Sequence, residues 1–286
     1  MKASALGRIG IWSMEMRFGD RADIVKAAPE IEALGFGTLW IPGGLDGGVL
    51  EGMDTLLPAT SRMVLATGIL NIWKHEPRQV ADWFNALPSD QRARVMLGLG
   101  VSHGPIIGES WKKPLAVTRE FLDGLGGGVP QENLCLAALG PKMLELSRDR
   151  TAGAHPYLAT PEHTASARRI LGAGKLLAPE QGVILETDPA KARDMGRQAL
   201  KMYSRLPNYR NNWLRLGFQE ADIDRMSDSF VDAVFAWGSD EQIAARVRAH
   251  HQAGADHVCL QVIQGSPGID VPGLLAACRR LAAFLL

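Results

Sequence analysis

This chain of 286 residues has few cysteines, no formal net charge and no long apolar run. The three cysteines, Cys135, Cys259 and Cys278, are odd in number and lie in apolar segments, which argues against a disulfide framework and indicates reduced packing residues. Lys and Arg together number 31, as do Asp and Glu, so charge favours neither nucleic acid nor an anionic membrane as a partner. No apolar run approaches a transmembrane length and the N-terminus has no apolar signal core, so we expect a cytoplasmic protein.

The glycine-rich turn of dinucleotide-binding folds is also missing. In a doubly wound sheet that turn would follow the first strand, and an acid would end the second strand. Here the first predicted strand is followed by residues 13–16, Ser-Met-Glu-Met, and the second by residues 42–44, Pro-Gly-Gly. Neither segment fits the pattern, which makes a Rossmann domain a poor interpretation.

The chain does contain one repeated unit, which consists of a polar helix, a glycine, an apolar strand and an exit rich in glycine or proline. Hydrophobic residues make up 46% of the chain and charged residues 22%, as in an ordinary globular core. Helix starts are marked by capping residues, for example the capping box of Ser239 and Gln242. The pattern predicts eight strands, at residues 8–12, 37–41, 63–67, 95–99, 134–139, 153–157, 182–185 and 257–263.

Eight strands separated mainly by helices predict an α/β fold with a parallel sheet. Together with the length of the chain, they favour a single (β/α)8 TIM barrel over residues 1–286. Residues 207–229 have weak periodicity and two helical fragments. We interpret them as an insertion before the last unit, with irregular capping structure as the alternative.

The stretch from Val95 to Pro105 shows how such a barrel could carry chemistry. An apolar run from Val95 to Leu99 is followed at once by glycines, a hydroxyl and an imidazole. Parallel strands deliver such residues to the carboxyl face of a barrel, where ligands bind, and glycine lets a ligand approach the backbone. The alternative is a buried strand with a tight exit turn.

The predicted strand exits are mostly glycine, apolar and aromatic, with two histidines, His75 and His103, and almost no carboxylates. This composition suits a flat, neutral ring system better than a metal ion or a two-acid hydrolase. A zinc site would need three or four converging ligands, and His250 and His251 lie in a predicted solvated helix. We therefore expect no metal site.

Several of these segments resemble one known family. Residues 65–70, 97–103 and 139–141 look like strands three, four and five of the luciferase-like monooxygenase superfamily, with the closest resemblance to its coenzyme F420-dependent branch. Residues 153–164 and 253–263 are also similar to the matching stretches of that branch. Each motif alone is weak, but the ordered set spans nearly the whole chain.

The resemblance implies a bacterial luciferase-like barrel with a deazaflavin or FMN ring at the carboxyl face. It implies a cis peptide bond at a bulge in strand three, here Gly68-Ile69, that backs the ring. It also implies a phosphate site at the start of the helix after strand five, where free N–H groups and the helix dipole favour an anion. An ordinary loop-to-helix turn is the alternative for Gly140-Pro141. The cofactor-binding residues that we predict are Gly43, Gly44, Thr67, Gly68, Ile69, Gly100, Val101, Ser102, Leu139, Gly140, Pro141 and Met143.

The chain departs from one part of this superfamily. The deazaflavin-dependent sugar-phosphate dehydrogenases carry a His after strand two and a Glu after strand four, where this chain has Gly44 and His103. Their acid–base pair and their substrate therefore do not carry over. We predict His103 as a proton donor or substrate clamp and His75 as a second candidate. The alternatives are a histidine that pins the strand-four loop and a helix-start histidine on the rim.

From these observations we expect an F420-dependent oxidoreductase that exchanges a hydride with a small organic substrate. An FMN-dependent luciferase-like monooxygenase is the first alternative, and a barrel that only binds a ligand is the second. Members of the superfamily often pair through helices beside strands two and three, so a homodimer is expected here too. The segments that would select the substrate are residues 42–52, 105–112 and 207–229.

Overall fold

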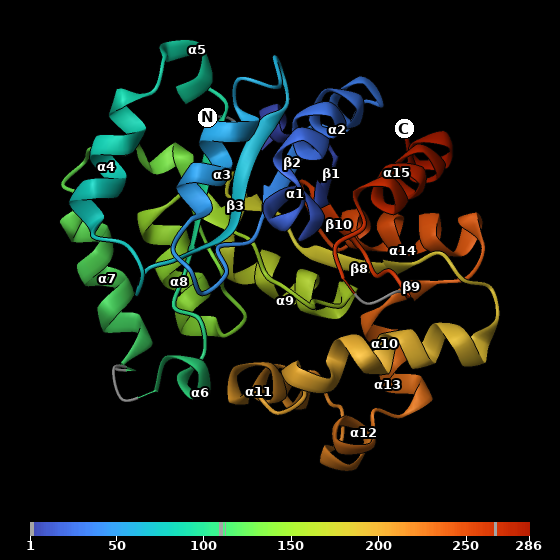
Figure 1. The fold of residues 1–286 in the computed structure, drawn as a ribbon. Helices are drawn as coiled ribbons and strands as arrows, with labels where there is room; N and C mark the ends of the chain where they lie inside the picture. The colour runs from blue at the N-terminus through green and yellow to red at the C-terminus, as the bar shows by residue number, and fades with distance from the viewer. Residues whose placement is uncertain (1–2, 109–110, 112, 266–267) are drawn as a thin grey trace.

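One parallel sheet of ten strands runs through the centre of the molecule, with helices packed around it (Figure 1). The computed structural model describes residues 3–108, 111, 113–265 and 268–286. The strand order in the sheet is β7-β6-β5-β4-β3-β2-β1-β10-β8-β9. The strands are β1 (Ile9–Trp12), β2 (Thr38–Ile41), β3 (Val64–Asn71), β4 (Val95–Gly100), β5 (Leu134–Leu136), β6 (Gly153–Ala154), β7 (Leu176–Leu177), β8 (Glu180–Ile184), β9 (Ala236–Trp237) and β10 (Val258–Val262).

Helices connect nearly all of these strands, and short 3-10 turns cover 3–6 and 131–133. None of the helices in the described ranges is long and apolar enough to cross a membrane. The helices are α1 (Glu15–Phe18), α2 (Arg21–Ala33), α3 (Val49–Leu56), α4 (Pro77–Ala86), α5 (Ser89–Arg92), α6 (Gly104–Ile107), α7 (Pro114–Gly124), α8 (Pro141–Arg150), α9 (Pro161–Leu171), α10 (Pro189–Tyr203), α11 (Pro207–Arg215), α12 (Glu220–Arg225), α13 (Asp228–Val234), α14 (Asp240–Gln252) and α15 (Val271–Leu285).

The strands read as continuous apolar runs because both faces of the sheet are covered. Every residue of β1, β2 and β4 is buried. Burial on both faces is typical of parallel sheets, in which crossover helices cover the outer side. The predicted α/β fold with a parallel sheet is thereby confirmed.

The number and bounds of the strands differ from the prediction around residue 180. The expected single strand at 182–185 starts two residues earlier, at Glu180, and a separate short strand, β7, precedes it. Pro179 divides the two because it has no backbone N–H to donate to the neighbouring strand. A further strand, β9, pairs with the end of β8. The eight expected strands thus become a curled sheet of ten.

The segment from β7 to β8 forms backbone hydrogen bonds on both of its edges. On one edge, the N–H groups of Leu176, Ala178 and Glu180 donate to carbonyls of residues 152, 154 and 156 next to β6, at 2.8–2.9 Å. On the other edge, the N–H of Cys259 in β10 donates to the carbonyl of Pro179 at 2.9 Å. The curled sheet therefore brings β6 and β10 to opposite sides of the same segment.

The segment predicted as an insertion, residues 207–229, holds α11, α12 and the start of α13. Together with α10 these helices build a second apolar cluster, which includes Trp213, Ile223 and Phe230. In Figure 1 they lie together at one end of the sheet, and Tyr209 of α11 contacts His103, which directly precedes α6. They therefore cover the region of the strand-four exit, which α6 follows.

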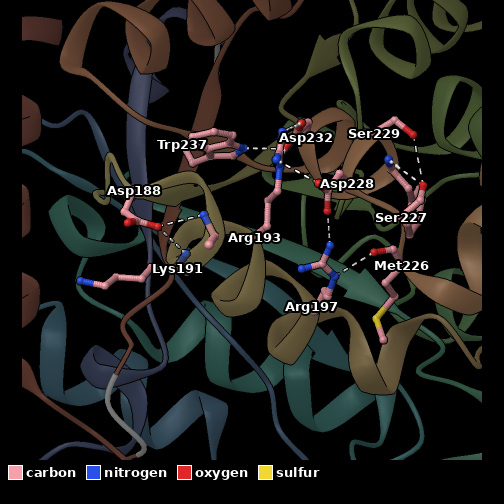
Figure 2. A network of polar contacts seen from close by, with 12 residues as sticks. Asp188, Lys191, Arg193, Arg197, Met226, Ser227, Asp228, Ser229, Asp232 and Trp237 are labelled. Atoms are coloured by element: carbon pink, nitrogen blue, oxygen red, sulfur yellow. Dashed lines mark hydrogen bonds and ion pairs between the residues drawn. The ribbon is translucent and has the colours of Figure 1, made fainter.

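Charged side chains join α10 to α13 on the outside of this cluster (Figure 2). The Arg193 guanidinium donates to both carboxylate oxygens of Asp232, at 3.0 and 2.7 Å, and also to Asp228. Arg197 donates to Asp228 as well, and the indole N–H of Trp237 donates to Asp232 at 2.8 Å. A bidentate arginine–carboxylate pair holds one geometry better than a single ion pair does.

Removal of the Asp232 carboxylate should therefore loosen this helix pair. We expect Asp232→Ala to lower the free energy of unfolding by about 1–2 kcal/mol, because two N–H donors and one indole N–H lose their partner. Asp149→Ala is the matched control, since it removes only an exposed pair with the adjacent Arg148 and should not change stability. Denaturant unfolding of the three proteins measures both effects, and equal stability of all three would contradict a structural role for the network.

Candidate functional site

The bulge in β3 is the centre of the predicted site. Pairing between β3 and β4 shifts register between Thr67 and Leu70, and the Gly68-Ile69 peptide bond is cis, which confirms that prediction. The carbonyl oxygen of Gly68 accepts a hydrogen bond from the indole N–H of Trp12, at the end of β1, at 2.8 Å. A side chain at Gly68 has no room, because a Cβ would lie 2.5 Å from that same indole nitrogen.

Two further glycines make room for Ile69. A Cβ on Gly43, just after β2, would lie 2.2 Å from the Ile69 carbonyl oxygen. A Cβ on Gly100, the last residue of β4, would lie 2.7 Å from two carbon atoms of the Ile69 side chain. The structure therefore brings together four of the predicted residues: Gly43, Gly68, Ile69 and Gly100.

The other predicted residues of these strands have different surroundings. The buried Thr67 hydroxyl donates to the Gly98 carbonyl at 2.8 Å, so the sheet itself uses it. Gly44 packs near Phe18 of α1, and the Val101 carbonyl accepts from the indole of Trp73 at 2.6 Å.

Ser102 has a left-handed backbone, with φ of 57°. Left-handed conformations are uncommon for residues other than glycine, and strained backbone concentrates at functional sites.

The turn between β5 and α8 contains the predicted phosphate-binding residues Leu139, Gly140, Pro141 and Met143. Pro141 is the first residue of α8, and the Met143 N–H donates back to the Gly140 carbonyl. Space beside Gly140 is open, because among the described residues the only atom within 4 Å of a Cβ there would be Nη2 of Arg215, at 3.8 Å. The turn is linked to the bulge through Ala137, whose side chain lies beside Gly100.

His103 and His75 lie in different environments. His103 precedes α6, and its ring centroid is 5.4 Å from that of Tyr209 in α11. His75 lies instead near the acidic side chains of Asp46 and Glu51, which raise its pKa, although burial outweighs them and lowers it. Burial also lowers the pKa of His103, and its Nδ1 is buried without a partner. Of the two, only His103 contacts the aromatic side chains at the strand exits.

All three tyrosines of the chain, Tyr157, Tyr203 and Tyr209, gather beside His103. Tyr157 follows β6, Tyr203 ends α10 and Tyr209 lies in α11, and neighbouring ring centroids are 5.1–6.3 Å apart. The Tyr157 ring also lies 5.5 Å from the ring of Trp12, which binds the Gly68 carbonyl. A continuous series of ring contacts therefore extends from the β3 bulge to the strand-four exit.

Glu180 is a functional candidate that the sequence analysis missed, as it missed Tyr203, Tyr209 and Arg215. It is the first residue of β8 and is fully buried. One carboxylate oxygen accepts the Leu158 N–H at 2.8 Å, and the other has no partner in the part of the chain that the structure describes. Burial raises the pKa of this carboxyl to about 8. The sequence analysis started this strand at residue 182, so it left Glu180 outside the strand. With the start at residue 180, the alternation of side chains along the strand would have indicated that Glu180 points inward.

Two other features lie away from this site. A cavity of about 170 Å³ is lined by residues of α1, α2 and α3, including Arg17 and Glu51, and by none of the predicted site residues. Among the described residues, no group of three His, Cys, Asp or Glu side chains is placed to hold a metal ion.

Comparison with known proteins gives a family match for the first half of the chain. Residues 2–134 match the model of the luciferase-like monooxygenase family, which confirms the resemblance to that family over this part of the chain. None of the curated proteins matches the chain.

Solved structures show the same fold over nearly the whole chain. An F420-dependent secondary alcohol dehydrogenase in complex with an F420-acetone adduct has a TM-score of 0.73 at 17% identity, covering 100% of both chains. The coenzyme F420-dependent tetrahydromethanopterin reductase of Methanopyrus kandleri has a TM-score of 0.68 at 15% identity, covering 97% of this chain and 98% of its own. The oxygenating constituent of 3,6-diketocamphane monooxygenase from the CAM plasmid of Pseudomonas putida, in complex with FMN, has a TM-score of 0.69 at 13% identity, with coverage of 97% and 98%.

The raised pKa of Glu180 predicts how stability depends on pH. Between the ordinary value of 4.5 and about 8, the folded protein keeps a proton that the unfolded chain releases. This group therefore stabilises the fold fully below about pH 4.5, and its contribution is lost as the pH rises through about 8. Glu180→Gln cannot titrate, so its melting temperature relative to that of the natural protein should rise from pH 5 to about pH 8 and stay level above it. A margin that stays constant with pH would contradict the assignment.

Proposed function

We propose that this chain, which matches the luciferase-like monooxygenase family over residues 2–134, is an oxidoreductase that uses coenzyme F420 to reduce or oxidise a small organic molecule. The observation that carries the proposal is the placement of Ile69. Gly43 and Gly100 leave space for it at the strand exits, beside a turn that is open at Gly140. Two of the structures with this fold are those of F420-dependent enzymes.

The β3 bulge fits a flat ring. Ile69 is half-buried, so part of its side chain is available to a ligand, while its other side packs on Gly100. The nearby side chains of Trp12 and Tyr157 are aromatic and uncharged. Apolar and aromatic walls with a few polar atoms are typical of cofactor pockets.

The β5–α8 turn fits the phosphate of such a cofactor. α8 has ten residues and starts with Pro141, so its first backbone N–H groups lie at an open turn. Arg215 of α11 lies beside this turn, and among the described residues its guanidinium forms no ion pair. Burial lowers the pKa of Arg215. An anion bound at the turn would stabilise the charged guanidinium.

The proposal takes the curled sheet to be a closed (β/α)8 barrel. The segment from β7 to β8 counts as one strand, because it bonds to the β6 segment on one edge and to β10 on the other. In a closed barrel the exits of all strands meet at one face, which brings the bulge, the α8 turn and the tyrosines into one site.

Bound F420 would supply the hydride chemistry, and the chain's own residues would bind, orient and exclude water. Ile69 would support the ring from behind, and Gly140 with Arg215 would hold the phosphate. The tyrosines and His103 would cover the substrate and keep water out. Burial lowers the pKa of His103, and its Nδ1, which has no partner among the described residues, is placed to hold a proton.

Titration of the purified protein with F420 and with FMN tests the proposal directly. We expect F420 to bind at least about tenfold more tightly than FMN, and hydride exchange with a panel of alcohols and carbonyl compounds to follow. Tighter binding of FMN would overturn the F420 assignment in favour of the flavin alternative, for which the FMN complex of the same fold is a precedent. Tight F420 binding with no turnover on the panel would favour a binding barrel.

Replacement of Ile69 should weaken the binding of the ring. If Ile69 supports it, Ile69→Ala should weaken F420 binding by more than about tenfold, or about 1.4 kcal/mol. Leu70→Ala is the matched control, because Leu70 is fully buried in the main core. The control should lower the melting temperature more while leaving the affinity of the folded protein within about threefold. A similar loss of affinity in both variants would argue against a contact between Ile69 and the ring.

Replacement of Gly140 should weaken only the phosphate contact. Gly140→Val should reduce F420 affinity by more than about tenfold and leave the melting temperature unchanged, because open space surrounds this position. The phosphate-free deazaflavin riboside is the control ligand, and its affinity should not change. An equal loss for both ligands would remove the phosphate from this turn.

A further inference from the structure

A cluster of buried side chains occupies the side of the curled sheet that faces away from the crossover helices. Trp12, Trp40, Ala66, Met96 and Cys259, from β1, β2, β3, β4 and β10, belong to this one apolar cluster. Among the described residues, none from an α-helix belongs to it. The strands therefore pack on one another on this side, which we call the inner face of the sheet.

Gln261 of β10 points to the inner face and has exposed surface there. It lies two residues after Cys259, and successive side chains of a strand alternate between the two faces. It is also in register with Trp12 of β1, another member of the inner cluster. The other residues of β10 are buried, whereas Gln261 is half-buried. A ligand can therefore reach its side chain.

Direct contacts connect Gln261 to the β3 bulge. Tyr157 donates its hydroxyl to Oε1 of Gln261 at 2.7 Å, and the Tyr157 ring lies 5.5 Å from that of Trp12. The Trp12 indole N–H in turn donates to the Gly68 carbonyl at 2.8 Å. Gly68, Ile69 and Tyr157 are half-buried as well. The exposed part of the inner face therefore extends from the bulge to Gln261.

The inner face is closed below Gln261. Cys259, two residues earlier in β10, is in register with Glu180 of β8, and both residues are fully buried. Gln261 is itself in register with Gly182, which has no side chain to cover it. Gln261 therefore lies at the floor of the exposed region rather than on its rim.

The hydrogen bond from Tyr157 decides which end of the Gln261 amide is free. An amide oxygen accepts and an N–H2 group only donates, so the Tyr157 hydroxyl keeps Oε1 on its own side. Within the described ranges, Nε2 has no hydrogen-bond partner. Its two N–H groups can be paired by an acceptor such as a carbonyl or hydroxyl oxygen, but not by a second donor such as an ammonium group.

We propose that Gln261 binds the oxygen of the substrate through its amide N–H2 and thereby selects small uncharged carbonyl compounds and alcohols over amines. This inference rests on the proposed oxidoreductase function, in which the substrate lies between the ring at Ile69 and the rest of the inner face. Gln261 contacts the substrate, whereas Tyr157 is a positioning residue that fixes the amide. A site that hydrogen-bonds a substrate oxygen rejects an analogue without it, because the donor is then left unpaired.

Nuclear magnetic resonance of the side-chain amides tests this contact without requiring turnover. The Gln261 N–H2 signals are identified by their absence from Gln261→Glu, or from Gln261→Met if the first variant does not fold. We expect cyclohexanone to shift these signals in a saturable way, in the cofactor-free or the F420-loaded protein. Cyclohexylamine, which is charged at neutral pH, should not shift them. The exposed Gln252 at the end of α14 is the internal control and should respond to neither compound.

Two results of this titration would overturn the proposal. One is the absence of any Gln261 response to cyclohexanone in both the cofactor-free and the F420-loaded protein. The other is an equal response to cyclohexylamine, because the amide would then not select an acceptor oxygen.

The kinetics of Gln261→Glu separate a substrate contact from a structural role. The carboxylate still accepts the Tyr157 hydroxyl but removes both N–H donors. We expect KM for cyclohexanone to rise by about tenfold or more and F420 affinity to stay within about threefold. KM for cyclohexanol should rise less, because its hydroxyl can donate to the carboxylate. Gln252→Glu makes the same charge change on the surface and should leave all three values unchanged.

The two other roles open to this amide give different results. If Gln261 only held Tyr157 in place, Gln261→Glu would leave KM for cyclohexanone unchanged. If it held the ring of the cofactor, F420 affinity would fall as much as the affinity for cyclohexanone. Either result would overturn the proposal. If neither F420 nor FMN binds, the proposed function fails, and the cyclohexanone titration of the cofactor-free protein still decides whether Gln261 binds a carbonyl oxygen.

Discussion

Close packing of Ile69 between two glycines is the constraint on which the rest of this structure depends. The carbonyl of Ile69 fits only because Gly43 has no side chain, and its side chain fits only because Gly100 has none. These glycines end or follow β2 and β4, the two neighbours of β3, so the whole sheet must be in register for the fit to exist. The bulge is therefore a rigid feature of the sheet rather than a flexible loop.

The other parts of the site are arranged around this fixed point. Trp12 binds the bulge from β1, and Tyr157 packs on Trp12 from the exit of β6. Helices α10 and α11 add the remaining tyrosines, and α11 also brings Arg215 to the α8 turn. The segment after β8 thus contributes both to the substrate side and to the phosphate side of the proposed site. Burial raises the pKa of Glu180 to about 8.

Sequence patterns predicted the local parts of this arrangement well. A glycine inside an apolar strand marked the bulge at Gly68, and an apolar run that ends in glycine, Ser102 and His103 marked the exit of β4. Both patterns depend only on neighbouring residues: a glycine has no side chain at its own position, and a strand exit is marked by the few residues that follow the apolar run. The family resemblance added the cis bond at Gly68-Ile69, which spacing alone would not have indicated.

The missed parts depend on contacts between distant segments. Tyr209 lies in the segment with weak periodicity and Tyr203 at the end of α10, and nothing in the sequence around either residue shows that it packs on Tyr157. Glu180 was missed because Pro179 interrupts the strand, which moved its predicted start to Gly182. Alternation from the correct start would have pointed Glu180 inward, but its lack of a cationic partner is a property of the folded chain alone.

A crystal structure of the protein soaked with F420 tests the central claim most directly, namely that the β3 bulge and the α8 turn form one cofactor site. The account predicts ring density against Ile69 and phosphate density within hydrogen-bond distance of the backbone at Gly140 and of Arg215. Ring density elsewhere, for example in the cavity beside Arg17, would contradict it, as would a phosphate far from the α8 turn.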